Sequence, residues 1–196
     1  MKKTTKVLSL LFVAAAMFMG CKQNAPEEPG KPDLTGDLFS PEETTVDATT
    51  VTLSDGSWTI RTVNKGSTME MAEELDCTVT NNAIDETADF TYKFSQSGTI
   101  PEEATAEMIA AYKEMGWEID GNKGSFYKSY TKNELVELDA KESKNDMEET
   151  ILSSFDRFIT NASQRSRWSG WKTNSDNTKY YCNDSDHNLK IYLKKN

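Results

Sequence analysis

Short runs in which apolar and polar residues alternate recur along the chain from residue 50 onward. The clearest run is Phe90–Phe94, and the runs 50–53, 58–63 and 75–80 alternate in the same way. An alternation with a period of two places every second side chain on the same face of an extended strand. The sequence therefore predicts four β-strands before any clear helix, and a fold built around a sheet.

Two short connections predict β-hairpins. Ser54–Ser57 separates the first two runs, and Asp120–Gly124 separates the aromatic-rich runs 117–119 and 126–130. Connections of this length that contain Gly, Asn or Asp are typical of hairpin turns. Three more strands are predicted near the C-terminus, at 171–173, 179–182 and 189–193.

Two segments have the apolar spacing of an amphipathic helix. The first is 101–115, where Thr99 and Glu102 would form a capping box and Gly116 would end the helix. The second is 145–162, in which apolar residues recur every three or four positions. Both helices would pack an apolar face against the predicted sheet.

These elements predict an α+β fold, with a single domain over 46–196 that is mainly an antiparallel sheet with two amphipathic helices. The segment 135–138 fits a strand as well as a helix and stays open. A chain of 196 residues with 36% hydrophobic residues has enough apolar material for one core of ordinary size.

The composition excludes several classes of function. The chain has one histidine, His187, so it cannot form a metal site from several histidines. Its formal net charge is −10, whereas a nucleic-acid-binding protein needs a clustered basic surface. The sequence predicts no cofactor, no metal site and no nucleic-acid partner.

The first 20 residues have the pattern of a secretory signal peptide. Lys2, Lys3 and Lys6 form a basic start, and the apolar run 7–19 follows them. That run is too short to span a bilayer comfortably as a helix, but it suits an export signal that is later removed.

Phe18-Met19-Gly20-Cys21 resembles the lipobox of a bacterial lipoprotein precursor, in the relaxed form found among spirochaetes. The box departs from the usual pattern at Phe18, where most members carry leucine. The resemblance implies that Cys21 is acylated and becomes the N-terminus after cleavage, and Lys22 favours the outer membrane by analogy. The alternative is an ordinary secreted protein in which Cys21 is a free thiol.

Residues 21–45 are predicted to be a tether between the lipid and the domain. This segment is rich in acidic residues and contains Pro26, Pro29, Pro32 and Pro41. Such a composition is typical of a solvated spacer without a core of its own.

Cys77 and Cys182 are the two remaining cysteines, and an exported protein can form disulfides. A bridge between them would join the first part of the sheet to the last. The alternative is two buried free thiols in strands that never meet.

The basic C-terminal part of the chain contains the best candidate binding residues. Residues 157–196 hold eight basic and three acidic residues, and they include Arg165, Arg167, Trp168 and Trp171. Arginine beside tryptophan is common in contact surfaces, so a protein or a glycan could bind there. The alternative is that one tryptophan packs in the core and the arginines pair with acidic residues of the protein's own acidic half.

The sequence thus predicts a lipid-anchored envelope protein with a binding or assembly role. It would be a surface interaction module or an accessory subunit of an exported complex, such as a surface protease complex, and not an enzyme. The alternative is an envelope hydrolase or a small-ligand-binding enzyme that uses Asp186 and His187.

Overall fold

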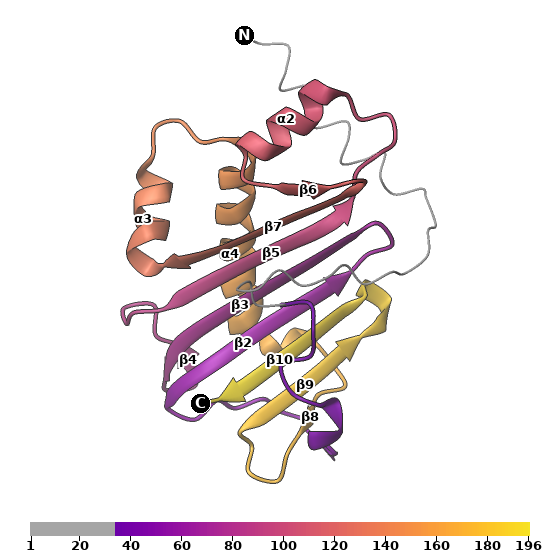
Figure 1. The fold of residues 1–196 in the computed structure, drawn as a ribbon. Helices are drawn as coiled ribbons and strands as arrows, with labels where there is room; N and C mark the ends of the chain where they lie inside the picture. The colour runs from indigo at the N-terminus through magenta and orange to yellow at the C-terminus, as the bar shows by residue number, and fades with distance from the viewer. Residues whose placement is uncertain (1–33) are drawn as a thin grey trace.

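The computed structural model describes residues 34–196, so the predicted leader, the lipobox and residues 22–33 lie outside the described part. Its centre is one antiparallel sheet with the strand order β1-β8-β9-β10-β2-β3-β5-β7-β6, and β4 pairs with β3 (Figure 1). Three α-helices accompany the sheet in the described residues, which confirms the prediction of a single α+β domain.

The strands are β1 (Val46–Asp47), β2 (Gly56–Lys65), β3 (Met69–Thr80), β4 (Ala83–Ile84), β5 (Thr91–Thr99), β6 (Glu118–Asp120), β7 (Lys123–Thr131), β8 (Lys172–Thr173), β9 (Lys179–Asp184) and β10 (Leu189–Lys195). The helices are α2 (Ala106–Glu114), α3 (Lys132–Ala140) and α4 (Asp146–Ser163), and the short 3-10 turns are η2 (Pro41–Glu43), η3 (Arg165–Arg167) and η4 (Ser185–His187).

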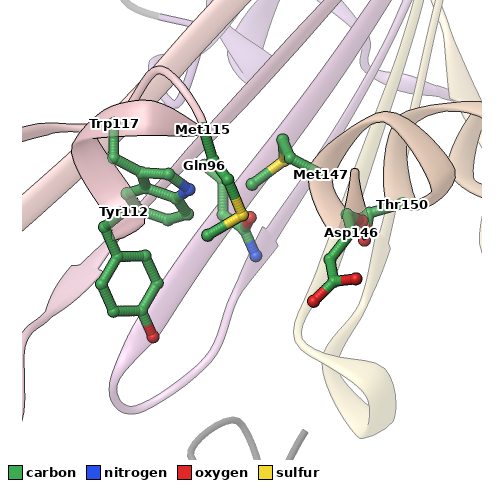
Figure 2. Close-up of a pocket in the computed structure, with 7 residues that line it drawn as sticks. All are labelled: Gln96, Tyr112, Met115, Trp117, Asp146, Met147 and Thr150. Atoms are coloured by element: carbon green, nitrogen blue, oxygen red, sulfur yellow. Dashed lines mark hydrogen bonds between the residues drawn. The ribbon is translucent and has the colours of Figure 1, made fainter. Parts of the chain in front are cut away.

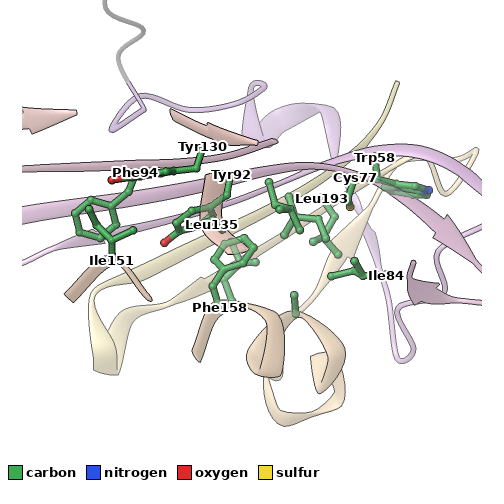
Figure 3. Close-up of a cluster of buried hydrophobic side chains, with 14 of the residues drawn as sticks. Trp58, Cys77, Ile84, Tyr92, Phe94, Tyr130, Leu135, Ile151, Phe158 and Leu193 are labelled. Carbon is green, nitrogen blue, oxygen red and sulfur yellow. The ribbon is translucent and has the colours of Figure 1, made fainter. Parts of the chain in front are cut away.

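The long helix α4 lies across one face of the sheet (Figure 1). Its residues Ile151 and Phe158 are fully buried, and the ring of Phe158 lies 6.0 Å from the ring of Tyr92 on β5. Figure 3 shows this layer, in which Leu135 of α3 also joins the core. The predicted stripe of α4 is therefore the main apolar cover of this face.

The opposite face of the sheet is covered by residues 34–43, which we call the N-terminal strap. Leu34 is 1% exposed and Phe39 is 8% exposed, and both pack against Tyr192 of β10 and its neighbours. The ring of Phe39 meets that of Tyr192 edge-on, with the centroids 5.3 Å apart. The strap thus buries apolar surface that the helices do not reach.

Polar contacts fix the strap in place as well. The carboxylate of Asp37 accepts hydrogen bonds from the Tyr192 hydroxyl and, over 3.0 Å, from Lys190 Nζ. The Tyr192 bond is the main reason why the pKa of Asp37 is lowered. Arg61 of β2 donates to the carbonyl of Gly36 over 3.2 Å. The predicted tether over 21–45 is therefore wrong from Leu34 onward, because a few apolar side chains in an acidic, proline-containing segment are enough to dock it.

The first predicted hairpin, which would pair residues 50–53 with 58–63, does not form in the structure. Residues 50–53 are not a strand, although Val51 and Leu53 are buried, and the Leu53 amide donates to Asn82 Oδ1 over 2.7 Å. The strand β2 pairs with β3 instead, with Trp58 opposite Cys77. The turn of this long hairpin contains Gly66, where an added Cβ would lie 2.8 Å from the carbonyl oxygen of Met69.

Two helix predictions also need correction. The first helix begins at Ala106 rather than 101, because Thr105 caps it and Thr99 ends β5. The open segment 135–138 lies in α3, a third helix, where Thr131 and Glu134 form a capping box. The predicted helix over 145–162 is confirmed, with Asn145 as its N-cap.

Glu73 is a carboxyl group in the helix-covered core. It is 4% exposed, and its oxygens accept from the hydroxyls of Tyr92, over 2.8 Å, and of Thr62, over 3.4 Å. Burial raises its pKa from 4.5 to about 7, against the hydrogen bond from Tyr92 and the charge of Arg157. Near neutral pH this group therefore takes up or releases a proton inside the core.

We expect Phe39→Ala to lower the free energy of unfolding by about 3 kcal/mol, because it leaves a cavity beneath the strap. Urea denaturation measures this change. Val46→Ala is the control, since Val46 is 50% exposed and its loss should cost less than about 0.5 kcal/mol. Equal effects of the two substitutions would show that the strap contributes nothing to the fold.

Glu73→Gln should change how stability depends on pH. The folded state holds the Glu73 proton more tightly than the unfolded state, so the contribution of Glu73 to stability is largest below pH 4.5 and falls as the pH rises through 7. This group alone should remove on the order of 3 kcal/mol over that range. The variant, measured by urea denaturation, should exceed the wild type at pH 8 and lose that advantage at pH 4.5.

The control for Glu73→Gln is Glu86→Gln, which changes an exposed carboxylate in a turn. Its difference from the wild type should stay within about 0.5 kcal/mol at both pH values. A Glu73→Gln difference that does not change with pH would contradict the shifted titration.

Candidate functional site

The predicted binding residues of the segment 165–171 lie mostly inside the protein. Trp171 is 4% exposed, and its Nε1 donates to the carbonyl of Arg165 over 3.2 Å. Trp168 is half-buried, with its ring centroid 6.3 Å from that of Trp171. Arg167 is exposed and donates to Gln164 over 3.0 Å. The four residues therefore do not form an open platform for a ligand.

Arg165 connects two parts of the fold. It is 7% exposed, and it donates over 2.7 Å to the carbonyl of Ala162 at the end of α4. It also donates over 2.8 Å to both the carbonyl and the side-chain oxygen of Asn82, in the turn between β3 and β4. The expected pairing of this arginine with acidic residues is replaced by bonds to neutral oxygens.

The two cysteines are free and buried. Strands β10 and β2 lie between β9, which holds Cys182, and β3, which holds Cys77. Three strand spacings amount to about 14 Å, whereas the Cα atoms of a disulfide lie within about 7 Å. This strand order does not allow the predicted bridge. Burial also raises the pKa of Cys77 to about 12 and that of Cys182 to about 11, so both thiols stay protonated.

The histidine of the alternative enzyme prediction sits on the exposed turn η4. Its Nδ1 lies 2.7 Å from Oδ2 of Asp184, not of Asp186, and its backbone amide donates to the same carboxylate. The hydrogen bond to His187 is the main cause of the lowered pKa of Asp184. This is the geometry of a capped turn, and it does not join His187 to Asp186 as predicted.

A pocket of about 180 Å³ lies between the sheet and the facing ends of α2 and α4. Figure 2 shows Tyr112, Met115 and Trp117 on one side and residues of α4 on the other. We call this site the Gln96 pocket. Its lining residues are Gln96, Tyr112, Met115, Trp117, Asp146, Met147 and Thr150.

Two glycines place Trp117 in the wall of this pocket. Gly116 ends α2 with a φ of +92°, a conformation that favours glycine, and the Trp117 amide then donates back to the Tyr112 carbonyl over 3.0 Å. The indole lies against Gly124 of β7, where an added Cβ would be 3.2 Å from the Trp117 ring. A side chain at Gly124 would crowd the indole and Ile100, and one at Gly116 would be strained and would meet the Phe126 ring.

The far side of the pocket is set by the start of α4. Asn145 caps the helix: its side chain accepts from the Glu148 amide, and the Glu148 carboxylate accepts from the Asn145 amide, both over 2.9 Å. This capping box fixes the first turn, so Asp146, Met147 and Thr150 face the pocket. Asp146 and Thr150 are exposed and form its rim.

Two buried polar atoms of the pocket lining have no hydrogen-bond partner among the described residues. They are Oε1 of Gln96 and Nε1 of Trp117. Gln96 and Trp117 are each 6% exposed. Buried donors and acceptors in proteins are almost always bonded, because leaving one unpaired costs about 1–3 kcal/mol. An unpaired acceptor and an unpaired donor in two residues that line one pocket therefore point to a partner from outside the chain, either a water or a ligand.

Comparison with known proteins found no matching family model, no similar curated protein and no similar solved structure. The candidate site is therefore defined by the geometry of this chain alone.

Within residues 34–196, no three His, Cys, Asp or Glu side chains lie together so that they could hold a metal ion. No helix in the same range is long and apolar enough to cross a membrane.

The Gln96 pocket could not be predicted from the sequence, because its lining residues come from segments that are far apart in the chain. Gln96 lies on β5, Trp117 follows α2, and the rim lies on α4. Each local signal was present, namely the Gly116 stop, the tryptophan and the Asn145 cap, but none shows which segments meet. Gln96, a polar residue on an inward-facing position of a strand, is the one signal that suggests a site.

Arg165 and Arg167 make a matched pair for testing whether the buried arginine stabilises the fold and the exposed one does not. Arg165→Ala should lower the free energy of unfolding by about 2 kcal/mol, because it leaves the buried carbonyl of Ala162 unpaired and removes two hydrogen bonds to Asn82. Arg167→Ala should change it by less than about 0.5 kcal/mol. Thermal or urea unfolding measures both, and equal, small effects would mean that Arg165 is not structural.

Proposed function

We propose that this protein is a lipid-anchored envelope protein that binds a small ligand in the Gln96 pocket. In this proposal the chain is exported, acylated on Cys21 and held at the outer membrane, and its domain has a binding role without catalysis. As a surface module or an accessory subunit, it would present the ligand site close to the membrane.

The observation that carries the binding role is the pair of unpaired atoms in the pocket, Oε1 of Gln96 and Nε1 of Trp117. Small-ligand sites are concave, largely apolar and equipped with a few polar groups that orient the ligand. The Gln96 pocket has this character, because aromatic and methionine side chains line it together with the polar residues Gln96, Asp146 and Thr150. A ligand in this pocket would supply hydrogen-bond partners for two buried polar atoms that the protein itself leaves unpaired.

The docked strap supports a site close to the membrane. Leu34 is held against the sheet, so only residues 22–33 separate the domain from Cys21. At roughly 3.5 Å per residue, this segment reaches at most about 45 Å. Several acyl chains on Cys21 would make the attachment nearly permanent, at about 0.8 kcal/mol per buried methylene.

The anchor is tested by labelling cells with a clickable fatty acid. The wild-type protein should be labelled and should fractionate with the outer membrane, and Cys21→Ser should be unlabelled. A labelled Cys21→Ser variant, or an unlabelled wild type, would contradict acylation at this position.

The ligand site is tested with a substitution at the rim. Thr150→Trp should block the pocket, whereas Thr160→Trp changes an equally exposed threonine of α4 outside it. The purified proteins are dialysed against a small-molecule extract of the envelope of the producing organism, and mass spectrometry identifies what each retains.

The wild type and Thr160→Trp should retain the same compound in about equal amounts with the protein, and Thr150→Trp should retain at most about a tenth of it. If the three proteins retain the same compounds in the same amounts, the Gln96 pocket is not a ligand site.

A further inference from the structure

We propose that the ligand of the Gln96 pocket is a neutral, hydroxyl-rich molecule the size of one sugar ring. This inference rests on the proposed binding function and names the chemistry of its ligand. It comes from the kind of polar atoms left unpaired, the size of the cavity and the charge around its rim.

The unpaired atoms demand a group that both donates and accepts. Oε1 of Gln96 can only accept a hydrogen bond, and Nε1 of Trp117 can only donate one. A hydroxyl group can do both. An ammonium group would leave the Trp117 indole unpaired, and a carboxylate would leave the Gln96 oxygen unpaired. The pair therefore favours a group that both donates and accepts, such as a hydroxyl, over a simple cation or a simple anion.

The rim of the pocket adds a charged acceptor. The carboxylate of Asp146 lies across the pocket from Trp117, as Figure 2 shows. A carboxylate accepts strong hydrogen bonds from hydroxyl groups and repels anions. The neighbouring Glu148 and Glu149 also belong to the first turn of α4. A ligand with hydroxyl groups on two sides would reach both the floor and the rim.

Part of the negative charge at this helix start is neutralised within the protein. Lys141 Nζ lies 2.8 Å from the carboxylate of Glu148, and the amide of Glu148 is bonded to the side chain of Asn145. The carboxylate of Asp146 at the exposed rim is therefore the charge that an anionic ligand would meet first.

The size and the walls fit one ring. A volume of about 180 Å³ corresponds to roughly six waters at liquid density, well below the pockets of drug-sized ligands. Tyr112 and Trp117 form the aromatic wall, with ring centroids 5.8 Å apart and planes at 69°. Met115 and Met147 complete the apolar lining. The C–H face of a sugar ring can pack on such walls while its hydroxyl groups face the polar atoms.

The test is calorimetric titration of the purified protein with probes that share one ring. Neutral probes are glucose, galactose, mannose and N-acetylglucosamine, the anionic probe is glucuronate, and the cationic probe is glucosamine. At least one neutral sugar should bind, and glucuronate should bind at least about tenfold more weakly than its neutral counterpart.

Three variants assign the binding to the proposed atoms. Gln96→Leu should weaken binding at least about tenfold with little change in the melting temperature of the free protein, because it removes an unpaired buried acceptor and a single weak bond from Gln96 Nε2 to Sδ of Met69. Asp146→Asn should weaken sugar binding and reduce the discrimination against glucuronate. Asp156→Asn, an exposed aspartate of α4 outside the pocket, should change neither.

The same titrations distinguish a free monosaccharide from the end of a glycan chain as the ligand. Tighter binding of a methyl glycoside or a short oligosaccharide than of the free sugar would identify the end of a glycan chain. Tighter binding of the free sugar would identify a free monosaccharide. Both outcomes support a neutral sugar ligand.

Two outcomes overturn the inference. If glucosamine or another amine binds and no neutral sugar does, the ligand class is wrong, but the pocket remains a ligand site. If no probe binds and the rim substitution Thr150→Trp changes nothing in the dialysis experiment, the cavity holds only water, and the proposed binding function fails too.

Discussion

The central hairpin β2–β3 is buried on both faces, by α4 on one and by the N-terminal strap on the other. The rest of the fold depends on this burial. Two adjacent residues of β3 show the consequence, because Glu73 and Glu74 are each 4% exposed. Glu74 is paired with Arg61 and Lys93. Glu73 faces the helix layer, where hydroxyl groups hold it and burial raises its pKa. A sheet covered by α4 alone would leave Val63 and Tyr192 open to water.

The sequence predicted those elements whose signals are local. The Asn145 cap starts α4, the alternation at 90–94 gives β5, and Gly116 ends α2 as expected. The strap was missed because its two anchors, Leu34 and Phe39, are isolated apolar residues in an acidic segment. Periodicity cannot detect a segment that docks through single side chains.

The errors in the predicted sites have one common cause, which is that the order of strands in a sheet cannot be inferred from local sequence patterns. The disulfide between Cys77 and Cys182 needed their strands to be neighbours, and β2 and β10 lie between them. The Arg165–Trp171 segment has the composition of a contact surface, but its indole and guanidinium groups serve the fold. Composition indicates which residue types are common in binding surfaces, but it does not show whether these residues are buried or exposed.

Trp117 and Trp171 show what separates a structural tryptophan from one that lines a site. Each follows a glycine with positive φ, and each is buried. The indole of Trp171 donates to the Arg165 carbonyl, whereas the indole nitrogen of Trp117, a residue that lines the Gln96 pocket, has no partner among residues 34–196. The central claim is that this difference reflects a ligand.

The most direct test is a high-resolution crystal structure of the protein with a neutral sugar. The account predicts hydroxyl groups within hydrogen-bond distance of both Trp117 Nε1 and Gln96 Oε1. A closed pocket, in which both atoms are bonded to the protein's own groups, would contradict it.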